Sequence, residues 1–173
     1  MNGVYPASAR VFRPWKNGGG ETAEILCWPE GAGLDDFTLR LSTARVAASG
    51  PFSLFPGVDR VLTVIEGGPM VLDLEGKEHG LGSDSAPFSF PGDTPCTARL
   101  DGAPVLDFNV MTRRPVRVRV TVGPLSVGAR FGLLLSPAAG LARLDLVDLE
   151  VADNDRVAAL TGTHAIAIHL LRG

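Results

Sequence analysis

Short apolar runs separated by turn-forming residues dominate this 173-residue chain and constrain its fold more than any other feature. Apolar residues alternate with polar ones or stand in brief uninterrupted runs, whereas the spacing of an amphipathic helix is almost absent. The 13 prolines and 21 glycines fall mostly between these runs, where turns need them. The pattern therefore predicts an all-β protein.

The predicted strands are short and follow one another at regular intervals, as in a jelly roll or a double-barrel sandwich. Residues 60–100 and residues 131–171 share an outline of apolar strand, turn, strand, Asp-containing turn and closing strands, which suggests two related β-barrel halves. The predicted strands cover residues 22–28, 37–44, 61–65, 70–74, 86–90, 96–100, 105–111, 116–122, 130–135, 141–146, 149–151, 157–160 and 165–171.

Length and composition indicate the size of the core, the cellular compartment and the state of the cysteines. The chain is long enough for one domain with a sizeable core or for two small lobes. No stretch has the length and apolar character of a signal peptide or a membrane span, so we expect a cytoplasmic protein without membrane contact. Two cysteines, Cys27 and Cys96, are too few for a disulfide framework and are expected to be reduced.

Charge argues against nucleic acid as a partner. The net charge is −3, and only two of the basic residues are lysines. The densest basic segment carries Arg113, Arg117 and Arg119, which would share one side of an extended chain opposite alternate valines. This stripe is short and lacks interleaved aromatic residues, so it predicts the solvent-facing side of a strand.

Residues 14–22, with the sequence PWKNGGGET, combine a bulky anchor, a cation, an amide and three consecutive glycines. Glycine loses more backbone entropy on ordering than any other residue, so this loop has either unusual backbone angles or a close approach to another group. An ordinary hairpin turn between strands is the alternative, because Asn-Gly is itself a hairpin signal. No Gly-Lys-Ser/Thr follows, which argues against a phosphate-binding loop.

Four segments together resemble one family: PWKNGGGETAEI at residues 14–25, RLSTARVAASGPFSLFPGVDR at 40–60, FPGD at 90–93 and DFNVMTRR at 107–114. They are similar to the HutD family, which also includes the Ves proteins. The resemblance implies a cupin-like bicupin of the RmlC jelly-roll type, forming one unit over residues 1–173. The first barrel would cover residues 20–112, and the second would cover residues 113–173 with a contribution from the N-terminal strands.

The resemblance also implies a role beside the enzymes of histidine utilisation. There a HutD protein would bind an acidic intermediate such as N-formylglutamate and restrain the pathway. Cupin metal sites need converging His and Glu ligands. The corresponding positions here hold Ser53, Phe55, Arg60 and Pro95, so we expect neither a metal nor another cofactor. The three histidines are scattered along the chain and are interpreted as surface or strand-end residues.

Arg60 is the leading candidate for a ligand anchor, because its planar guanidinium donates two parallel hydrogen bonds to a carboxylate. A structural ion pair with Asp59 or another acid is the alternative. Strand alternation places Asp107, Asn109 and Arg113 on one side of residues 107–113, and that side either lines a pocket or faces water. If the Gly-rich loop folds over the barrel mouth, the predicted ligand-binding set is Lys16, Asn17, Glu24, Arg40, Ser42, Arg60, Asp107, Asn109 and Arg113.

These residues favour a metal-free protein that binds a small acidic metabolite, and the resemblance implies that it regulates amino-acid catabolism. An isomerase, lyase or hydrolase without a cofactor is the alternative, with Asp107, Glu24 or Lys16 as the base. A purely structural β protein is a third possibility, but it would leave the Gly-rich loop and the arginines without a purpose. A homodimer formed through a sheet edge such as residues 117–122 is also expected.

Overall fold

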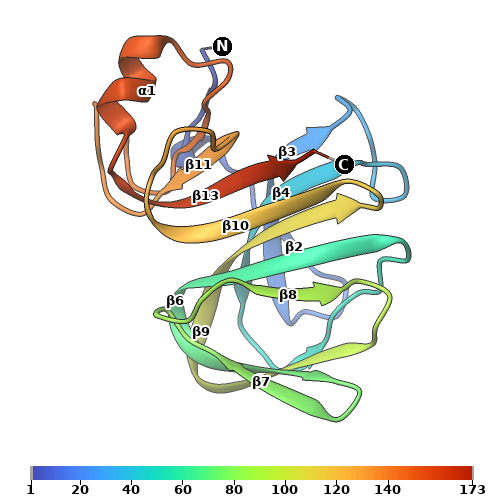
Figure 1. Cartoon of the computed structure of the whole chain (residues 1–173). Helices are drawn as coiled ribbons and strands as arrows, with labels where there is room; N and C mark the ends of the chain where they lie inside the picture. The colour runs from blue at the N-terminus through green and yellow to red at the C-terminus, as the bar shows by residue number, and fades with distance from the viewer. Residues whose placement is uncertain (1, 173) are drawn as a thin grey trace. The chain divides into compact units, whose positions relative to one another are not determined.

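The computed structural model describes residues 2–172 and divides them into two compact units (Figure 1). One unit is the continuous segment Val11–Val116, and the other combines the chain up to Arg10 with the chain from Arg117 onward. All pairings between the described strands are antiparallel. The prediction of an all-β protein is confirmed.

The Val11–Val116 unit is built on one sheet with the strand order β2-β3-β4-β9-β6-β7; β5 also pairs with β9, and β8 with β6. Its strands are β2 (Arg13–Pro14), β3 (Gly20–Trp28), β4 (Leu39–Val46), β5 (Gly50–Pro51), β6 (Val58–Leu74), β7 (Lys77–Leu81), β8 (Phe88–Pro91) and β9 (Cys96–Arg113).

Strands β6 and β9 pair along almost their full length, and each merges two strands that the sequence analysis separated. The register shifts three times between Val64 and Met70, so the paired ribbon bends there without ending. Gly67 lies at this bend with φ +80°, and a Cβ on it would lie 1.9 Å from the carbonyl oxygen of Pro104. Only glycine fits this close approach between the two strands.

A core cluster of ten buried side chains lies in this unit, and Leu62, Met70 and Leu72 within it are fully shielded from solvent. Trp15 and Phe52 are partly buried and pack against the same cluster. Burial of this apolar surface is the main favourable contribution to folding of the unit. The core therefore extends to the Gly-rich loop.

The second unit contains a five-stranded sheet with the order β1-β12-β11-β13-β10. Its elements are β1 (Val4–Tyr5), the short 3-10 helix η1 (Ala7–Ala9), β10 (Arg117–Pro124), β11 (Phe131–Leu134), β12 (Leu146–Asp148), α1 (Asn154–Leu160) and β13 (His164–Leu171). Strand β10 is at one edge of this order, so pairing of two copies through residues 117–122 stays a prediction.

Three predicted strands in this unit are wrong or shortened. Residues 157–160 belong to α1, because Asp153 caps the helix by accepting a hydrogen bond from the Arg156 amide at 2.8 Å. Most of residues 141–146 bend around Asp145, whose carboxylate accepts bonds from the amides of Ala142 and Ala7. Residues 149–151 form turns after β12.

The basic stripe is also divided. Arg113 ends β9, whereas Arg117 and Arg119 lie on β10 of the other unit. Those two arginines are exposed, as predicted, but Arg113 is half-buried and donates to the backbone carbonyl of Phe37 at 2.9 Å. Over residues 2–172, none of the helices has the length and apolar character that crossing a bilayer demands.

Candidate ligand-binding site

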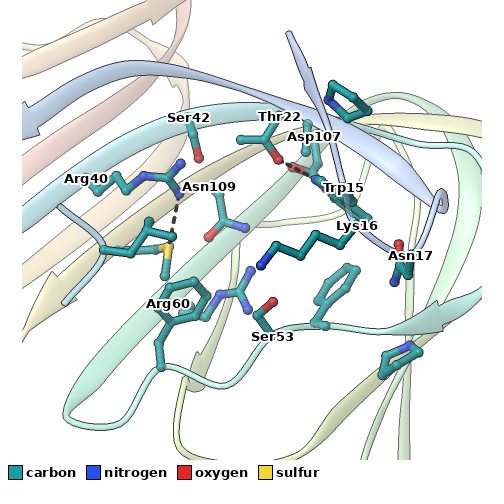
Figure 2. A pocket seen from close by; sticks show the side chains of 17 residues that line it. Trp15, Lys16, Asn17, Thr22, Arg40, Ser42, Ser53, Arg60, Asp107 and Asn109 are labelled. Carbon is teal, nitrogen blue, oxygen red and sulfur yellow. Dashed lines mark hydrogen bonds between the residues drawn. The ribbon is translucent and has the colours of Figure 1, made fainter.

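A cavity of about 660 Å³ lies within the Val11–Val116 unit (Figure 2). Its walls come from the loop after β2, the adjacent strands β4, β9 and β6, and the segment after β5. Seven predicted site residues line it: Lys16, Asn17, Arg40, Ser42, Arg60, Asp107 and Asn109. The aromatic lining residues are Trp15, Phe52 and Phe55.

The Gly-rich loop is a hairpin connection and also a wall of this cavity, so both sequence interpretations apply. The Trp15 amide donates to the Gly20 carbonyl at 2.8 Å, and the Gly18 amide donates to the Trp15 carbonyl at 3.1 Å. Asn17 stabilises the turn by accepting a bond from the Gly19 amide at 2.9 Å. The turn brings Lys16 into the cavity, where its side chain extends toward Arg60 (Figure 2).

Trp15 fixes the loop against the body of the unit. Its indole Nε1 donates to the hydroxyl of Thr22 at 2.7 Å, and its ring meets Phe52 edge-on with 6.2 Å between centroids. Gly20 makes this position possible, because a Cβ there would lie 3.1 Å from the indole ring and 2.4 Å from the Arg45 carbonyl oxygen. The glycine requirement at this point is therefore a close approach between backbone and ring.

Arg60 is a buried cation with aromatic neighbours instead of an acidic partner. Its side chain projects from β6 and is 7% exposed, with the guanidinium carbon 5.1 to 5.5 Å from the ring centroids of Phe52, Phe55 and Phe90. Among residues 2–172 no carboxylate lies within 4 Å of it, and its Nε has no hydrogen-bond partner.

The proposed structural pair between Arg60 and Asp59 is not formed. Asp59 accepts a bond from Arg114 at 3.0 Å, on the other side of the strand. Burial lowers the pKa of Arg60 to about 10, so the guanidinium still carries its charge at neutral pH. The cavity thus contains a permanent positive charge that no acid of the described chain neutralises by direct contact.

Strand β9, which pairs with β6, carries two further buried polar side chains that line the cavity together with Arg60. Asp107 and Asn109 lie on one side of β9, and Ser42 is the register partner of Asn109 on β4. The Oδ1 atoms of Asp107 and Asn109 have no hydrogen-bond partner in the described chain. Burial raises the pKa of Asp107 to about 7, against the opposing effect of the Arg60 charge.

Arg40 adds a second guanidinium to the cavity wall. It donates to Glu24 at 3.0 Å, and Glu24 is half-exposed outside the lining residues. Nη1 of Arg40 donates to the sulfur of Met111 at 4.0 Å (Figure 2). Glu24 therefore orients Arg40 from outside the cavity lining, whereas the sequence analysis placed Glu24 in the ligand-binding set.

Arg113 is the second predicted residue outside the lining. Its guanidinium is held by the carbonyls of Phe37 and Pro56, so it does not reach the side of β9 that carries Asn109. Sequence reasoning did not include the aromatic lining residues Trp15, Phe52 and Phe55 in the predicted ligand-binding set. Of the four positions that the sequence analysis matched to cupin metal ligands, Ser53, Phe55 and Arg60 line the cavity, whereas Pro95 does not.

No three His, Cys, Asp or Glu side chains of residues 2–172 come together in a group able to hold a metal ion. Besides the cations Lys16, Arg40 and Arg60, the lining holds side-chain acceptors that include a single carboxyl group: Asn17, Thr22, Ser42, Ser53, Asp107 and Asn109. Such a set suits an anion, because a metal ion would lie beside guanidinium groups.

The HutD family model matches residues 7–167 of this chain. The chain belongs to the HutD family. The Ves protein of Citrobacter koseri is 46% identical over 102 residues, which are 58% of this chain and 52% of that protein, so the chain spans about half its length. The Ves protein of Cronobacter sakazakii is 38% identical over 135 residues, covering 76% of this chain and 73% of that protein.

Solved structures agree with this HutD-family assignment. HutD from Pseudomonas fluorescens SBW25 is 33% identical and superposes with a TM-score of 0.75 over 98% of both chains. A conserved protein of unknown function from Pseudomonas aeruginosa PAO1 is 30% identical, with a TM-score of 0.71 over 96% of this chain and 91% of that one. The all-β, cupin-like fold class is confirmed, whereas two closed barrels stay a prediction.

Proposed function

We propose that this HutD-family protein binds a small acidic metabolite in the cavity and thereby regulates histidine utilisation. The observation that carries the proposal is Arg60, a buried guanidinium that lines the cavity and has no carboxylate within 4 Å in residues 2–172. A buried charge is costly unless it is paired. A carboxylate from a ligand would supply the missing partner.

The rest of the cavity fits an acid of modest size. Its volume of about 660 Å³ is in the range of small-molecule sites. Lys16 and Arg40 place two more cations on the wall, and Asp107 is the only acid among the lining residues. The amide of Asn109 and the hydroxyls of Ser42 and Ser53 are suited to an amide or a second carboxylate. N-formylglutamate has both of these groups, formiminoglutamate has the second carboxylate, and urocanate has one carboxylate and an imidazole.

A titration of thermal stability tests this proposal. Metal-stripped protein is titrated with N-formylglutamate, formiminoglutamate, urocanate and glutamate. An acid at about 100 times its dissociation constant is expected to add roughly 2.7 kcal/mol to the free energy of unfolding. Arg60→Ala and the longer Arg60→Met are expected to lose this stabilisation, because neither side chain donates to a carboxylate.

Arg99→Ala is the matched control. Arg99 belongs to the same unit, but its side chain is exposed and its ion pairs with Glu78 and Asp101 lie outside the cavity lining. We expect this variant to respond to the acid like the unchanged protein. An unchanged melting curve with all four acids, or equal stabilisation of both Arg60 variants, would contradict the proposal.

One observation favours an enzyme as the second candidate. Burial holds the pKa of Asp107 at about 7, which is where a general base works best at neutral pH. Incubating the protein with each acid and following it by proton NMR distinguishes the two functions, because only an enzyme converts the acid.

A further inference from the structure

Asp107 is an acid enclosed in a cavity that otherwise presents cations and neutral groups. Its side chain is 1% exposed, it projects from β9 into the cavity, and its Oδ1 has no hydrogen-bond partner in the described residues. The charge of Arg60 acts on Asp107, although the two side chains do not approach within ion-pair distance. An acidic ligand held by Arg60 would enter the same small volume as this carboxyl group.

The charged and titratable groups around Asp107 come from each neighbouring element. Strand β6 contributes Arg60, and β4 contributes Arg40, whose charge is balanced by Glu24 of β3. The loop between β2 and β3 contributes Lys16. Cys96, at the start of β9, interacts with Arg60, and burial raises the pKa of its thiol, so it adds no negative charge at neutral pH.

We propose that binding of an acid in this cavity is coupled to protonation of Asp107, so that the protein takes up one proton from solvent as the acid binds. This inference rests on the proposed function. The carboxylate of Asp107 becomes a neutral carboxyl group, and no covalent bond to the ligand forms. Two carboxylates in one enclosed site do not both remain ionised, because their repulsion and loss of hydration raise the pKa of one. Protonated Asp107 also changes from an acceptor to an O–H donor for the bound acid.

The coupling determines how affinity changes with pH. Without ligand, burial raises the pKa of Asp107 to about 7. Well below that pH the group is already protonated, so binding takes up no proton and the affinity is constant. Above it, the proton must come from solvent, and the dissociation constant is expected to rise by about tenfold per pH unit.

Isothermal titration calorimetry measures the proton directly. The protein is titrated with N-formylglutamate and with glutarate from pH 5.5 to 8.5, in pairs of buffers that differ in ionisation enthalpy. Both carboxylates of each acid stay ionised over most of this range, so a buffer-dependent heat reports on the protein. Urocanate is unsuitable, because its imidazole titrates near neutral pH. We expect uptake to rise from near zero at pH 5.5 toward one proton at pH 8.5.

Asp107→Asn separates this coupling from a merely structural role. Asparagine is neutral and keeps an N–H donor, so this variant is expected to bind without proton uptake and more tightly than the unchanged protein at pH 8.5. Glu78→Gln is the control, because Glu78 is an exposed acid of the same unit that pairs with Arg99 outside the cavity lining, and this variant is expected to leave the uptake unchanged.

The unchanged protein alone decides the question if Asp107→Asn does not fold. Binding with a buffer-independent heat and a constant affinity across the range overturns the coupling and leaves the proposed function standing. Absence of binding by both acids at pH 5.5, where the coupling favours it most, overturns the proposed function and the coupling together.

Discussion

Leu72→Ala is expected to lower the free energy of unfolding of the Val11–Val116 unit by about 2 to 5 kcal/mol. Leu72 lies on β6, has no exposed surface and belongs to the same core cluster as Leu62 and Met70. Removing its isobutyl group takes away apolar contacts and leaves a cavity that the long paired strands β6 and β9 are too constrained to close. Urea denaturation followed by circular dichroism measures the change.

Leu54→Ala is the matched control for this substitution. Leu54 is in the same unit but is 54% exposed, so the same chemical change removes little buried surface. We expect a loss within about 0.5 kcal/mol, as for surface substitutions in general. Equal losses for the two variants would contradict the placement of Leu72 in the core.

Gly67→Ala is expected to destabilise the same unit by about 2 to 5 kcal/mol. Two effects add. An L side chain at φ +80° costs about 1 to 2 kcal/mol, and the overlap of a Cβ only 1.9 Å from the Pro104 carbonyl oxygen forces β6 and β9 apart at their bend, at about 1 to 3 kcal/mol. Thermal and urea unfolding of the full chain measure the sum.

Gly76→Ala isolates the first of these effects. Gly76 has a similar φ of +86°, but a Cβ there would meet no heavy atom within 4 Å. We therefore expect the dihedral cost alone, about 1 to 2 kcal/mol. If Gly67→Ala were no more destabilising than Gly76→Ala, the close contact between the strands at Pro104 would be wrong.

The fold class could be predicted from the sequence because strands with one buried face keep a period of two. The type and the ends of the individual strands and helices could not be predicted in every case. Val157 to Leu160 form an apolar run too short to distinguish strand from helix, and the cap at Asp153 decides for a helix. The break between residues 65 and 70 predicted two strands, but register shifts with extra residues on both β6 and β9 let the pairing continue through the bend.

The candidate site was predictable where alternation along a strand was enough. This holds for Asp107 and Asn109 on β9 and for Arg40 and Ser42 on β4, which register brings side by side. Arg113 follows the same alternation, yet carbonyls of two loops distant in sequence hold its guanidinium. The missing ion pair of Arg60 and its aromatic surroundings depend on packing, which one sequence does not specify.

The division into two units also predicts the order in which they fold during synthesis. All residues of the cavity wall lie between Pro14 and Met111, within one uninterrupted segment. Strand β1, in contrast, precedes this segment, whereas its partner β12 follows it at residues 146–148. Because domains tend to fold as units during synthesis, the ligand-binding unit is expected to assemble before β12 has been made, and β1 pairs only afterwards.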